Sequence, residues 1–144
     1  MVIVPPPASP MGTLEGLLVV DLTRVLAGPF CTMHLADMGA EVIKIEEPGL
    51  GDDSRAWAPF VDQWSAYFLG INRGKKSVAL NLKTKSGTEA LGRLLDRADV
   101  FIENLKPGSL DRLGFGYAET SRRNPALVHC SITGYGQNGP RRDL

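Results

Sequence analysis

The hydrophobic and polar positions in the first part of the chain predict a strand, a helix and a second strand in succession. The apolar run Leu17–Leu22 is typical of a buried strand. Gly28–Gly39 follows, with Pro29 near its start and a glycine at its end, which is the usual arrangement around a helix. Glu41–Ile45 has the pattern of the second strand. A short unit of alternating strands and helices is therefore expected at the start of the domain.

The rest of the chain continues this alternation. A helix is predicted from Ser86 onward, because five apolar residues fall on one helical face: Ala90, Leu91, Leu94, Leu95 and Ala98. The remaining predictions are a loop over Pro48–Pro59, helices over Ser65–Ile71 and Tyr117–Arg123, and strands over Ser77–Leu82, Asp99–Ile102 and Leu127–Ile132. Strands that alternate with helices imply parallel pairing through right-handed crossovers. The predicted fold class is α/β, a three-layer parallel sheet with flanking helices.

The composition is that of one soluble globular domain. The chain has 144 residues, 16 basic and 16 acidic side chains, a formal net charge of +0 and 43% hydrophobic residues. This much apolar material offsets the entropy cost of ordering, which excludes global disorder. The balanced charge disfavours a nucleic-acid-binding protein. No apolar run approaches the ~20 residues that a membrane span needs, so no membrane partner is expected.

Residues 1–11 are expected to form a flexible, proline-rich tail, which leaves 12–144 as the domain. Met1–Pro10 contains no basic residue and has three consecutive prolines, Pro5–Pro7. A signal peptide is therefore not expected, and neither is an Arg-rich transit sequence. Two cysteines are too few for a disulfide scaffold, which favours a cytoplasmic location.

Gly134–Gly139 spells the G-x-G-x-x-G pattern of dinucleotide-binding proteins, directly after a predicted strand. That pattern also needs a helix start and an acid about 20 residues later. Only Pro140–Leu144 follows, and Asn138-Gly-Pro is also typical of a plain turn. A non-catalytic dinucleotide-binding module is therefore one alternative interpretation of the chain.

Gly70–Ser77 resembles a phosphate-binding loop without matching it. Three residues separate its glycines where four are needed, and it precedes a strand instead of linking a strand to a helix. A nucleoside triphosphatase of the P-loop class is therefore disfavoured. Arg73, Lys75 and Lys76 could still meet a phosphate by charge, or form a solvated entry to the strand.

Two cysteines and two histidines raise the question of a zinc site: Cys31, His34, His129 and Cys130. The last two are adjacent on a predicted strand, so their side chains leave opposite faces and no metal is expected. Cys31 is expected in the first turn of a helix, where the helix dipole favours a thiolate, but no base for it is identifiable. Buried, unreactive cysteines are the favoured interpretation.

Acidic and aromatic residues between positions 52 and 68 have structural explanations as well as functional ones. Asp52 and Asp53 follow a glycine, where carboxylates form turns more often than metal sites. The aromatic residues are expected in the core or at a subunit contact, with base stacking as the minority role: Trp57, Trp64, Tyr67 and Phe68.

A series of short motifs carries a family resemblance. The motifs are Leu14–Leu17, Val20–Pro29, Gly39–Glu46, Gly51–Asp52, Asn72–Ser77, Leu80–Lys83, Asp99–Asn104, Pro107–Gly108, Leu113–Gly114 and Ser131–Gly136. In this order and spacing they resemble the N-terminal part of the family III CoA-transferases, the formyl-CoA transferase and carnitine CoA-transferase group. The similarity runs from about Met11 to Leu144 and is greatest for the branch that uses succinyl-CoA and dicarboxylic acids such as glutarate.

The resemblance implies a Rossmann-like segment of a larger fold that transfers CoA between carboxylic acids. In such enzymes the acyl group passes through an anhydride, and CoA through a thioester on a nucleophilic Asp carboxylate. That Asp is expected beyond Leu144, so the chain alone is expected to be inactive. The implied substrates are an acyl-CoA and a small carboxylic acid, without a permanently bound cofactor. The full-length parent is expected to be an interlocked homodimer.

The resemblance also implies which residues contact CoA: Leu26, Ala27, Glu47, Leu80, Asn81, Leu82, Lys83, Asn104, Leu105, Lys106 and Arg112. Glu47 departs from the family, which often has Arg at this position. Physical reasoning supports the set, because open α/β sheets bind ligands at the carboxyl ends of their strands. Three cations after later strands are expected to meet the phosphates there: Lys83, Lys106 and Arg112. Peptide nitrogens after Leu22 are expected to face the same crevice, and Val25–Ala27 would contact the pantetheine arm.

A third alternative is a purely structural fragment that binds no ligand and needs a partner chain to fold. A monomeric molten state or an aggregate would favour it.

Overall fold

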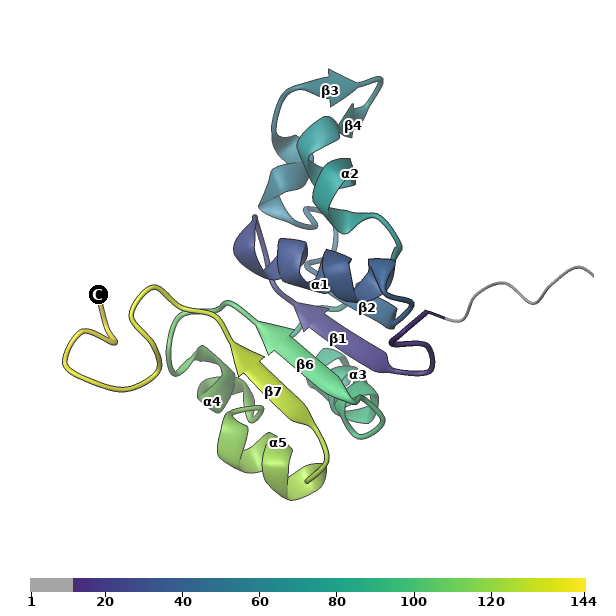
Figure 1. Cartoon of the computed structure of the whole chain (residues 1–144). Coiled ribbons are helices and arrows are strands. Elements are labelled where there is room, and N and C mark those ends of the chain that lie inside the picture. The colour runs from purple at the N-terminus through teal and green to yellow at the C-terminus, as the bar shows by residue number, and fades with distance from the viewer. Residues whose placement is uncertain (1–11) are drawn as a thin grey trace, which may run out of the picture.

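A computed structural model describes residues 12–144, so the predicted tail lies outside the described residues. Five parallel strands form one sheet in the order β5-β2-β1-β6-β7 (Figure 1). Their bounds are β1 Leu18–Leu22, β2 Glu41–Glu46, β5 Lys75–Ala79, β6 Val100–Glu103 and β7 Val128–Ser131. The chain winds outward from β1 through β2 to β5, then returns to the other side of β1 with β6. The winding direction therefore reverses between β1 and β6, which is where open α/β sheets bind their ligands.

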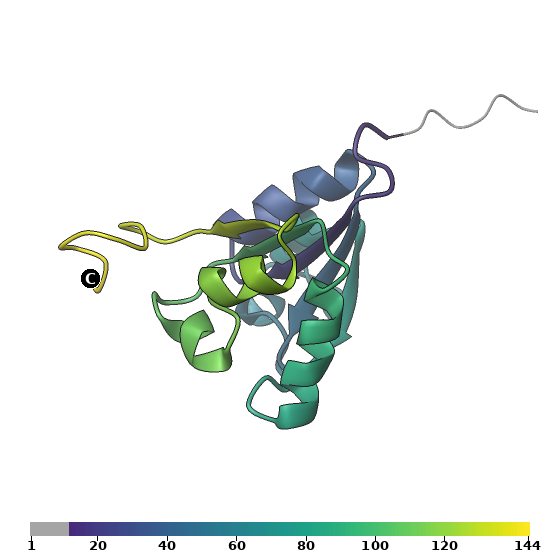
Figure 2. The same cartoon turned by 90° about the horizontal axis from the view of Figure 1, so that it is seen from below.

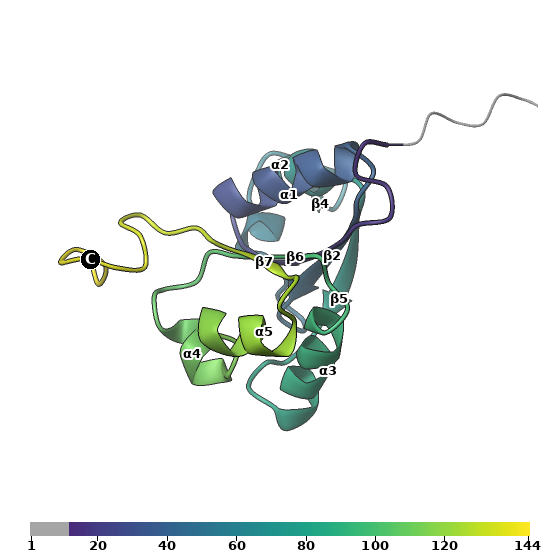
Figure 3. The ribbon, with the colours of Figure 1, turned by 60° about the horizontal axis from the view of Figure 1, so that its bottom comes forward.

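Helices cover both faces of the sheet, so the predicted three-layer α/β architecture is confirmed (Figure 3). One face carries α1 (Ala27–Asp37), with α2 (Ala66–Asn72) packed beside it. The other carries α3 (Lys85–Leu95), α4 (Ser109–Leu113) and α5 (Tyr117–Arg123). The segment after β7 extends away from the layers (Figure 2).

A separate excursion joins β2 to α2 and stands apart from the sheet in Figure 1. It contains the short 3-10 helix η1 (Asp53–Ala56) and a hairpin of β3 (Phe60–Val61) and β4 (Trp64–Ser65). The sequence analysis predicts only a loop here, because two-residue strands are too short to show a periodic pattern.

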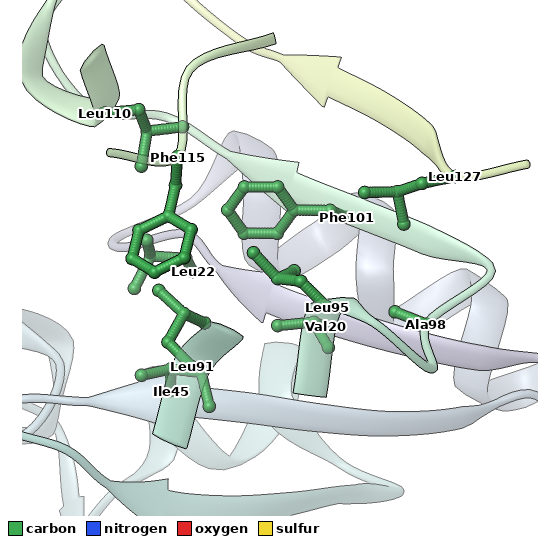
Figure 4. Packing of buried hydrophobic residues seen from close by; sticks show 10 residues of the cluster. All are labelled: Val20, Leu22, Ile45, Leu91, Leu95, Ala98, Phe101, Leu110, Phe115 and Leu127. Atoms are coloured by element: carbon green, nitrogen blue, oxygen red, sulfur yellow. The ribbon is translucent and has the colours of Figure 1, made fainter. Parts of the chain in front are cut away.

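Two apolar clusters form the core, one on each face of the sheet. The larger lies against α3, α4 and α5 (Figure 4) and consists of Val20, Leu22, Ile45, Leu91, Leu95, Ala98, Phe101, Leu110, Phe115 and Leu127. The smaller lies on the α1 side and contains Val19, Ala40, Val42 and Ile102. The central strand β1 contributes Val19 to one cluster and Val20 to the other, which explains why its sequence is an uninterrupted apolar run.

Strand β5 is the main boundary that the sequence misplaces. It spans Lys75–Ala79 instead of Ser77–Leu82, because the ladder ends where Leu80 N–H donates to the Glu46 carbonyl oxygen. The apolar residues after it pack from a loop against the larger core cluster: Leu80 and Leu82. The helix that follows keeps the predicted stripe, with Leu91, Leu95 and Ala98 buried.

Of the aromatic residues expected in the core or at a subunit contact, Trp57 and Trp64 lie outside the core. Trp57 is 41% exposed and Trp64 is 49% exposed. Phe68 is buried, and the Arg55 guanidinium carbon lies 3.8 Å from the centre of its ring.

In the part of the chain that the structure describes, none of the helices combines the length and apolar character needed to cross a bilayer.

Candidate ligand site at the carboxyl edge of the sheet

A cavity of about 230 Å³ lies at the carboxyl ends of β1 and β2, on the face that carries α3 and α4. Its apolar walls are Leu22, Ile45, Leu80, Leu82, Leu105 and Leu113. Its polar lining consists of Arg24, Glu46, Glu47, Asn81 and Lys83. Apolar walls with a few polar groups are typical of small-molecule sites. The volume is below the ~300–1,000 Å³ that encloses a whole drug-sized ligand, so this cavity suits one end of a larger molecule.

Glu47 lies between two cations in the lining of this cavity. Its carboxylate is 3.7 Å from Arg24 Nη2 through one oxygen and 3.4 Å from Lys83 Nζ through the other. The side chains of Arg24, Glu47 and Lys83 are 46%, 39% and 84% exposed. The charges therefore lie on the solvent side of the cavity, where each pair is worth little and can separate.

The loop from Leu80 to Lys83 is held by its own polar residues. The Asn81 side chain accepts from the Lys83 N–H at 3.0 Å, and the Thr84 hydroxyl donates to the Asn81 carbonyl oxygen at 2.8 Å. The same hydroxyl accepts from the Gly87 N–H and so caps α3. A Cβ on Gly87 would lie 2.0 Å from the Asn81 carbonyl oxygen, so only glycine permits this close approach. The start of α3 thus fixes one wall of the cavity.

Asn104 connects the two loops at the point where the sheet reverses its winding. Its Oδ1 accepts from the Arg24 N–H at 2.8 Å, and its Nδ2 donates to the Arg24 carbonyl oxygen at 2.8 Å. The resemblance implies that Asn104 contacts CoA, but its amide is already bonded to the chain. Asn104 therefore orders Arg24, which lines the cavity.

The peptide nitrogens after β1 are not available as the sequence analysis expects. Thr23 N–H donates to the Asp21 carboxylate, Arg24 N–H to Asn104, and Val25 N–H to the Asp52 carboxylate. The expectation of bare amide groups at these three positions is wrong. Val25 has φ +68°, an unfavourable value for a β-branched residue, and the contact with Asp52 holds it there.

A buried ion pair between Lys44 of β2 and Asp52 of the excursion connects these two segments. Lys44 Nζ lies 2.9 Å from Asp52 Oδ2 and donates to the Thr23 carbonyl oxygen at 2.9 Å, and both charged side chains are almost fully buried. Burial alone would raise the pKa of Asp52, but Lys44 and Ser54 together bring it below its usual value. Asp52 also accepts from the Ser54 N–H, which confirms it as a turn former.

Glu46 lines the cavity, but its carboxylate bonds to other residues of the protein. Arg55 donates to both of its oxygens, at 2.7 and 2.6 Å, and Ser77 and the Asp52 N–H also donate to it. Burial would raise the pKa of Glu46, but these hydrogen bonds outweigh it and lower the pKa to about 2. Glu46 is therefore an ionised carboxylate whose charge is balanced by Arg55, and its role is structural.

A second buried ion pair lies on the side of the sheet that carries α1 and α2. Lys75 Nζ is 3.1 Å from Asp21 Oδ2 and donates to the Pro29 carbonyl oxygen and Asn72 Oδ1. Burial lowers the pKa of Lys75, and Asp21 opposes the shift. Arg73 pairs with Asp37, and Lys76 pairs with Glu41. All three cations of Gly70–Ser77 therefore form ion pairs with acidic side chains of the same chain.

The structure brings together half of the twelve residues expected to contact CoA. Glu47, Leu105 and the four residues Leu80–Lys83 line the cavity. A neighbouring hollow is lined by others: Ala27, Asn104, Leu105 and Lys106. Leu105 belongs to both, so the two hollows share a wall. Val25, Leu26 and Arg112 line neither.

The three cations expected to form one cluster lie around different features. Lys83 lines the cavity, whereas Lys106 lines the neighbouring hollow and a more polar one beside Glu103 and His129. Arg112 Nη2 donates to the Ser109 hydroxyl within α4. The prediction that all three cations form one phosphate site is therefore wrong. The second cation beside Lys83 is Arg24.

Five lining residues are absent from the sequence-based set: Leu22, Arg24, Ile45, Glu46 and Leu113. Four of them lie within two residues of the carboxyl end of β1 or β2. The rule that ligands meet the carboxyl ends of parallel strands therefore identifies them in principle. Leu113 lies on α4, whose five residues carry no clear helical pattern.

His129 and Cys130, the adjacent pair in the candidate zinc set, lie on opposite faces of the sheet. His129 packs against Phe101 and accordingly faces α5, whereas Cys130 packs with the α1-side cluster. Within 12–144, no group of three or more His, Cys, Asp or Glu side chains is arranged to hold a metal ion. No helix begins in residues 132–144 after the glycine pattern. Cys31 is the fifth residue of α1, beyond the first turn where it was expected.

Comparison with known proteins gives a consistent result. A family model described as CoA-transferase family III matches residues 14–144. The chain is 54% identical over 131 residues to succinyl-CoA:glutarate CoA-transferase of Mus musculus, and 51% identical over 134 residues to acetyl-CoA:oxalate CoA-transferase of Acetobacter aceti. The alignments cover 90% and 93% of this chain but 30% and 34% of those proteins. The chain thus spans about a third of the length of these curated relatives.

Solved structures agree with the sequence matches. The crystal structure of a CAIB/BAIF family protein from Brucella suis superposes with a TM-score of 0.87 at 46% identity, over 92% of this chain and 36% of that one. Rv3272 from M. tuberculosis superposes with a TM-score of 0.88 at 40% identity, over 94% of this chain and 38% of that one. The described sheet and its helices therefore correspond to about a third of each solved protein.

Proposed function

The chain belongs to CoA-transferase family III, and from this premise we propose that it forms the N-terminal, CoA-binding part of an enzyme that transfers CoA between carboxylic acids. The supporting observation is the cavity at the carboxyl edge of the sheet. Its leucine and isoleucine walls suit an adenine ring, and Arg24 and Lys83 offer positive charge beside it. The cavity admits one end of CoA, so the pantetheine arm would extend over the shared wall at Leu105 toward Ala27.

The proposed chemistry needs a carboxylate nucleophile from outside residues 12–144. The family resemblance assigns it to an Asp that forms first an anhydride with the acyl group and then a thioester with CoA. The two buried Asp residues of the described structure have other partners: Asp21 of β1 bonds Lys75, Thr23 and Thr32, and Asp52 of the excursion bonds Lys44. The 144-residue chain is therefore expected to bind CoA without transferring it.

The proposed substrates of the whole enzyme are succinyl-CoA and a dicarboxylic acid such as glutarate. The 54% identity to the mouse succinyl-CoA:glutarate enzyme supports this choice. The 51% identity to the Acetobacter enzyme makes acetyl-CoA and oxalate the pair to test against it.

The whole enzyme is also proposed to be a homodimer. Large apolar side chains of the excursion are exposed: Trp57, Phe60, Val61 and Trp64. Exposed apolar groups gathered on one segment often mark an interaction surface. Concentration-dependent sedimentation that is abolished in Trp64→Ser would support a role of this surface in self-association. An unchanged sedimentation profile would argue against it.

Calorimetric titration of the 144-residue chain with CoA tests the proposed function. Lys83→Ala is expected to weaken CoA binding at least threefold. Lys85→Ala removes a neighbouring cation that lines neither hollow and is expected to have no effect. NAD should give no heat. If CoA also gives none, the proposal fails. Transfer of CoA from succinyl-CoA to glutarate by this chain alone would instead contradict the location of the nucleophile.

A further inference from the structure

From the charges around the cavity we infer that Glu47 selects against a phosphate at this end of the ligand, so that the site gains little from the 3′-phosphate of CoA. This inference rests on the proposed function, because it concerns the same cavity. The inference goes beyond the proposed function because it assigns to one residue the preference between CoA and dephospho-CoA. These two ligands differ only in the 3′-phosphate.

The lining of the cavity suits the adenine end of CoA. Six apolar side chains form its walls, and the charged side chains that line it are mostly exposed. A flat adenine ring suits such walls better than the two amides of the pantetheine arm, which would leave buried polar groups unpaired. The adenosine ribose would then lie at the charged rim, and its 3′-phosphate would lie within reach of Arg24 and Lys83.

A phosphate in this position would compete with Glu47 for those cations. Glu47 approaches both of them, at 3.7 Å from Arg24 and 3.4 Å from Lys83. A phosphate that binds the same cations must displace the Glu47 carboxylate or accept a like charge a few ångströms away, and either event costs free energy. The net charge of this group of three side chains is +1, whereas a neutral residue at position 47 would leave +2.

Glu47 differs from Glu46, the other carboxylate that lines the cavity. Glu46 is held by two hydrogen bonds from Arg55 and one from Ser77, and its side chain is only 4% exposed. Its charge is therefore compensated from within. Glu47 has only the two exposed cations as charged partners in the described structure. It is thus the carboxylate that an incoming phosphate would meet.

The test compares CoA with dephospho-CoA by calorimetry on the wild-type chain and on Glu47→Gln, at two salt concentrations. The wild type should bind the two ligands within about threefold of each other. Glu47→Gln should bind CoA about tenfold more tightly, equivalent to 1.4 kcal/mol, and leave dephospho-CoA within about threefold. The gain should shrink at high salt because exposed charges are screened.

A matched control removes a carboxylate from elsewhere on the surface. Glu89 lies near Lys85 on α3, is exposed, and lines neither hollow, so Glu89→Gln should leave both affinities unchanged. Thermal unfolding of each variant checks that the fold is kept. If the wild type binds CoA and Glu47→Gln leaves the ratio of the two affinities unchanged, the inference is wrong and the proposed function stands. If neither protein binds either ligand, both are wrong.

Discussion

The side-chain amide of Asn104 forms two hydrogen bonds with the backbone of Arg24, one to its N–H and one to its carbonyl oxygen, each 2.8 Å long. The two residues are 80 positions apart in the chain. They follow β1 and β6, the neighbouring strands between which the sheet reverses its winding. A single side chain therefore joins the two loops that border the candidate site.

Asn104→Ala is expected to lower the free energy of unfolding by about 1–2 kcal/mol, because two net hydrogen bonds are lost. It should also weaken CoA binding, since Arg24 loses its fixed position beside the cavity. Asn104→Asp keeps the acceptor and loses the donor, so its effect on stability should be intermediate. Chemical denaturation and calorimetry measure the two effects. An Asn104→Ala protein with wild-type affinity would show that the connection has no part in binding.

Lys44→Met is expected to lower the free energy of unfolding by about 3–5 kcal/mol, because it leaves the Asp52 carboxylate buried without its cation. The double variant Lys44→Met/Asp52→Asn should recover part of this loss, since the unpaired charge is removed and the amide oxygen can still accept from Ser54. Urea denaturation of the wild type, Lys44→Met, Asp52→Asn and the double variant gives the coupling energy between the two side chains. Lys76→Met, which breaks an exposed pair with Glu41, is the control and should change stability by less than about 1 kcal/mol.

Stability is expected to fall as the pH drops from about 5 toward 2. The pKa of Glu46 is about 2 in the folded protein, against ~4.3 in an unfolded chain, so the unfolded state takes up the proton first. This carboxylate contributes on the order of 3 kcal/mol above pH 5, and the contribution disappears near its folded pKa. Asp52, whose pKa is also lowered, acts in the same direction.

Denaturation across this pH range measures the effect, with Glu46→Gln as the informative variant. It should be less stable than the wild type at pH 7 and show a shallower loss toward acid. Glu41→Gln, which changes an exposed carboxylate, should follow the wild-type profile. Parallel profiles for the wild type and Glu46→Gln would contradict the assigned role of Glu46.

Gly87→Ala is expected to destabilise the protein by at least 1–3 kcal/mol, although alanine favours helices. Its Cβ would lie 2.0 Å from the Asn81 carbonyl oxygen, so the loop that carries Lys83 must move. CoA affinity should fall with stability. Gly70→Ala is the matched control, because Gly70 lies in α2 and a Cβ on it would have no neighbour within 4 Å. This substitution should stabilise the protein by about 0.5–1 kcal/mol.

The sheet was predictable because its strands and helices have local patterns. The apolar run of β1, the proline and glycine around α1 and the stripe on α3 each depend on residues close in sequence. The hairpin of the excursion was not predictable in this way, since its two-residue strands are defined by pairing with each other. The bounds of β5 depend on where pairing with β2 ends, and this is also a tertiary contact.

The candidate site was predictable in part for the same reason. The carboxyl-edge rule and the family resemblance select Glu47 and Leu80–Lys83, which do line the cavity. Which cation joins Lys83 depends on how the loops after β1 and β6 are ordered, so Arg24 was missed and Arg112 was wrongly grouped with Lys83. The charged residues inside β2 have partners on the excursion, which no local pattern identifies.

The central position of β1 has a kinetic consequence. Pairing of β1 with β2 joins residues about 23 apart, whereas pairing with β6 joins residues about 81 apart. During synthesis, one edge of β1 stays unpaired until the ribosome has released Val100–Glu103. The hollow beside Leu22 and the hydrogen bonds between Asn104 and Arg24 therefore form only after β6 has been synthesised. A nascent chain that stalls earlier exposes an apolar strand edge to chaperones and to aggregation.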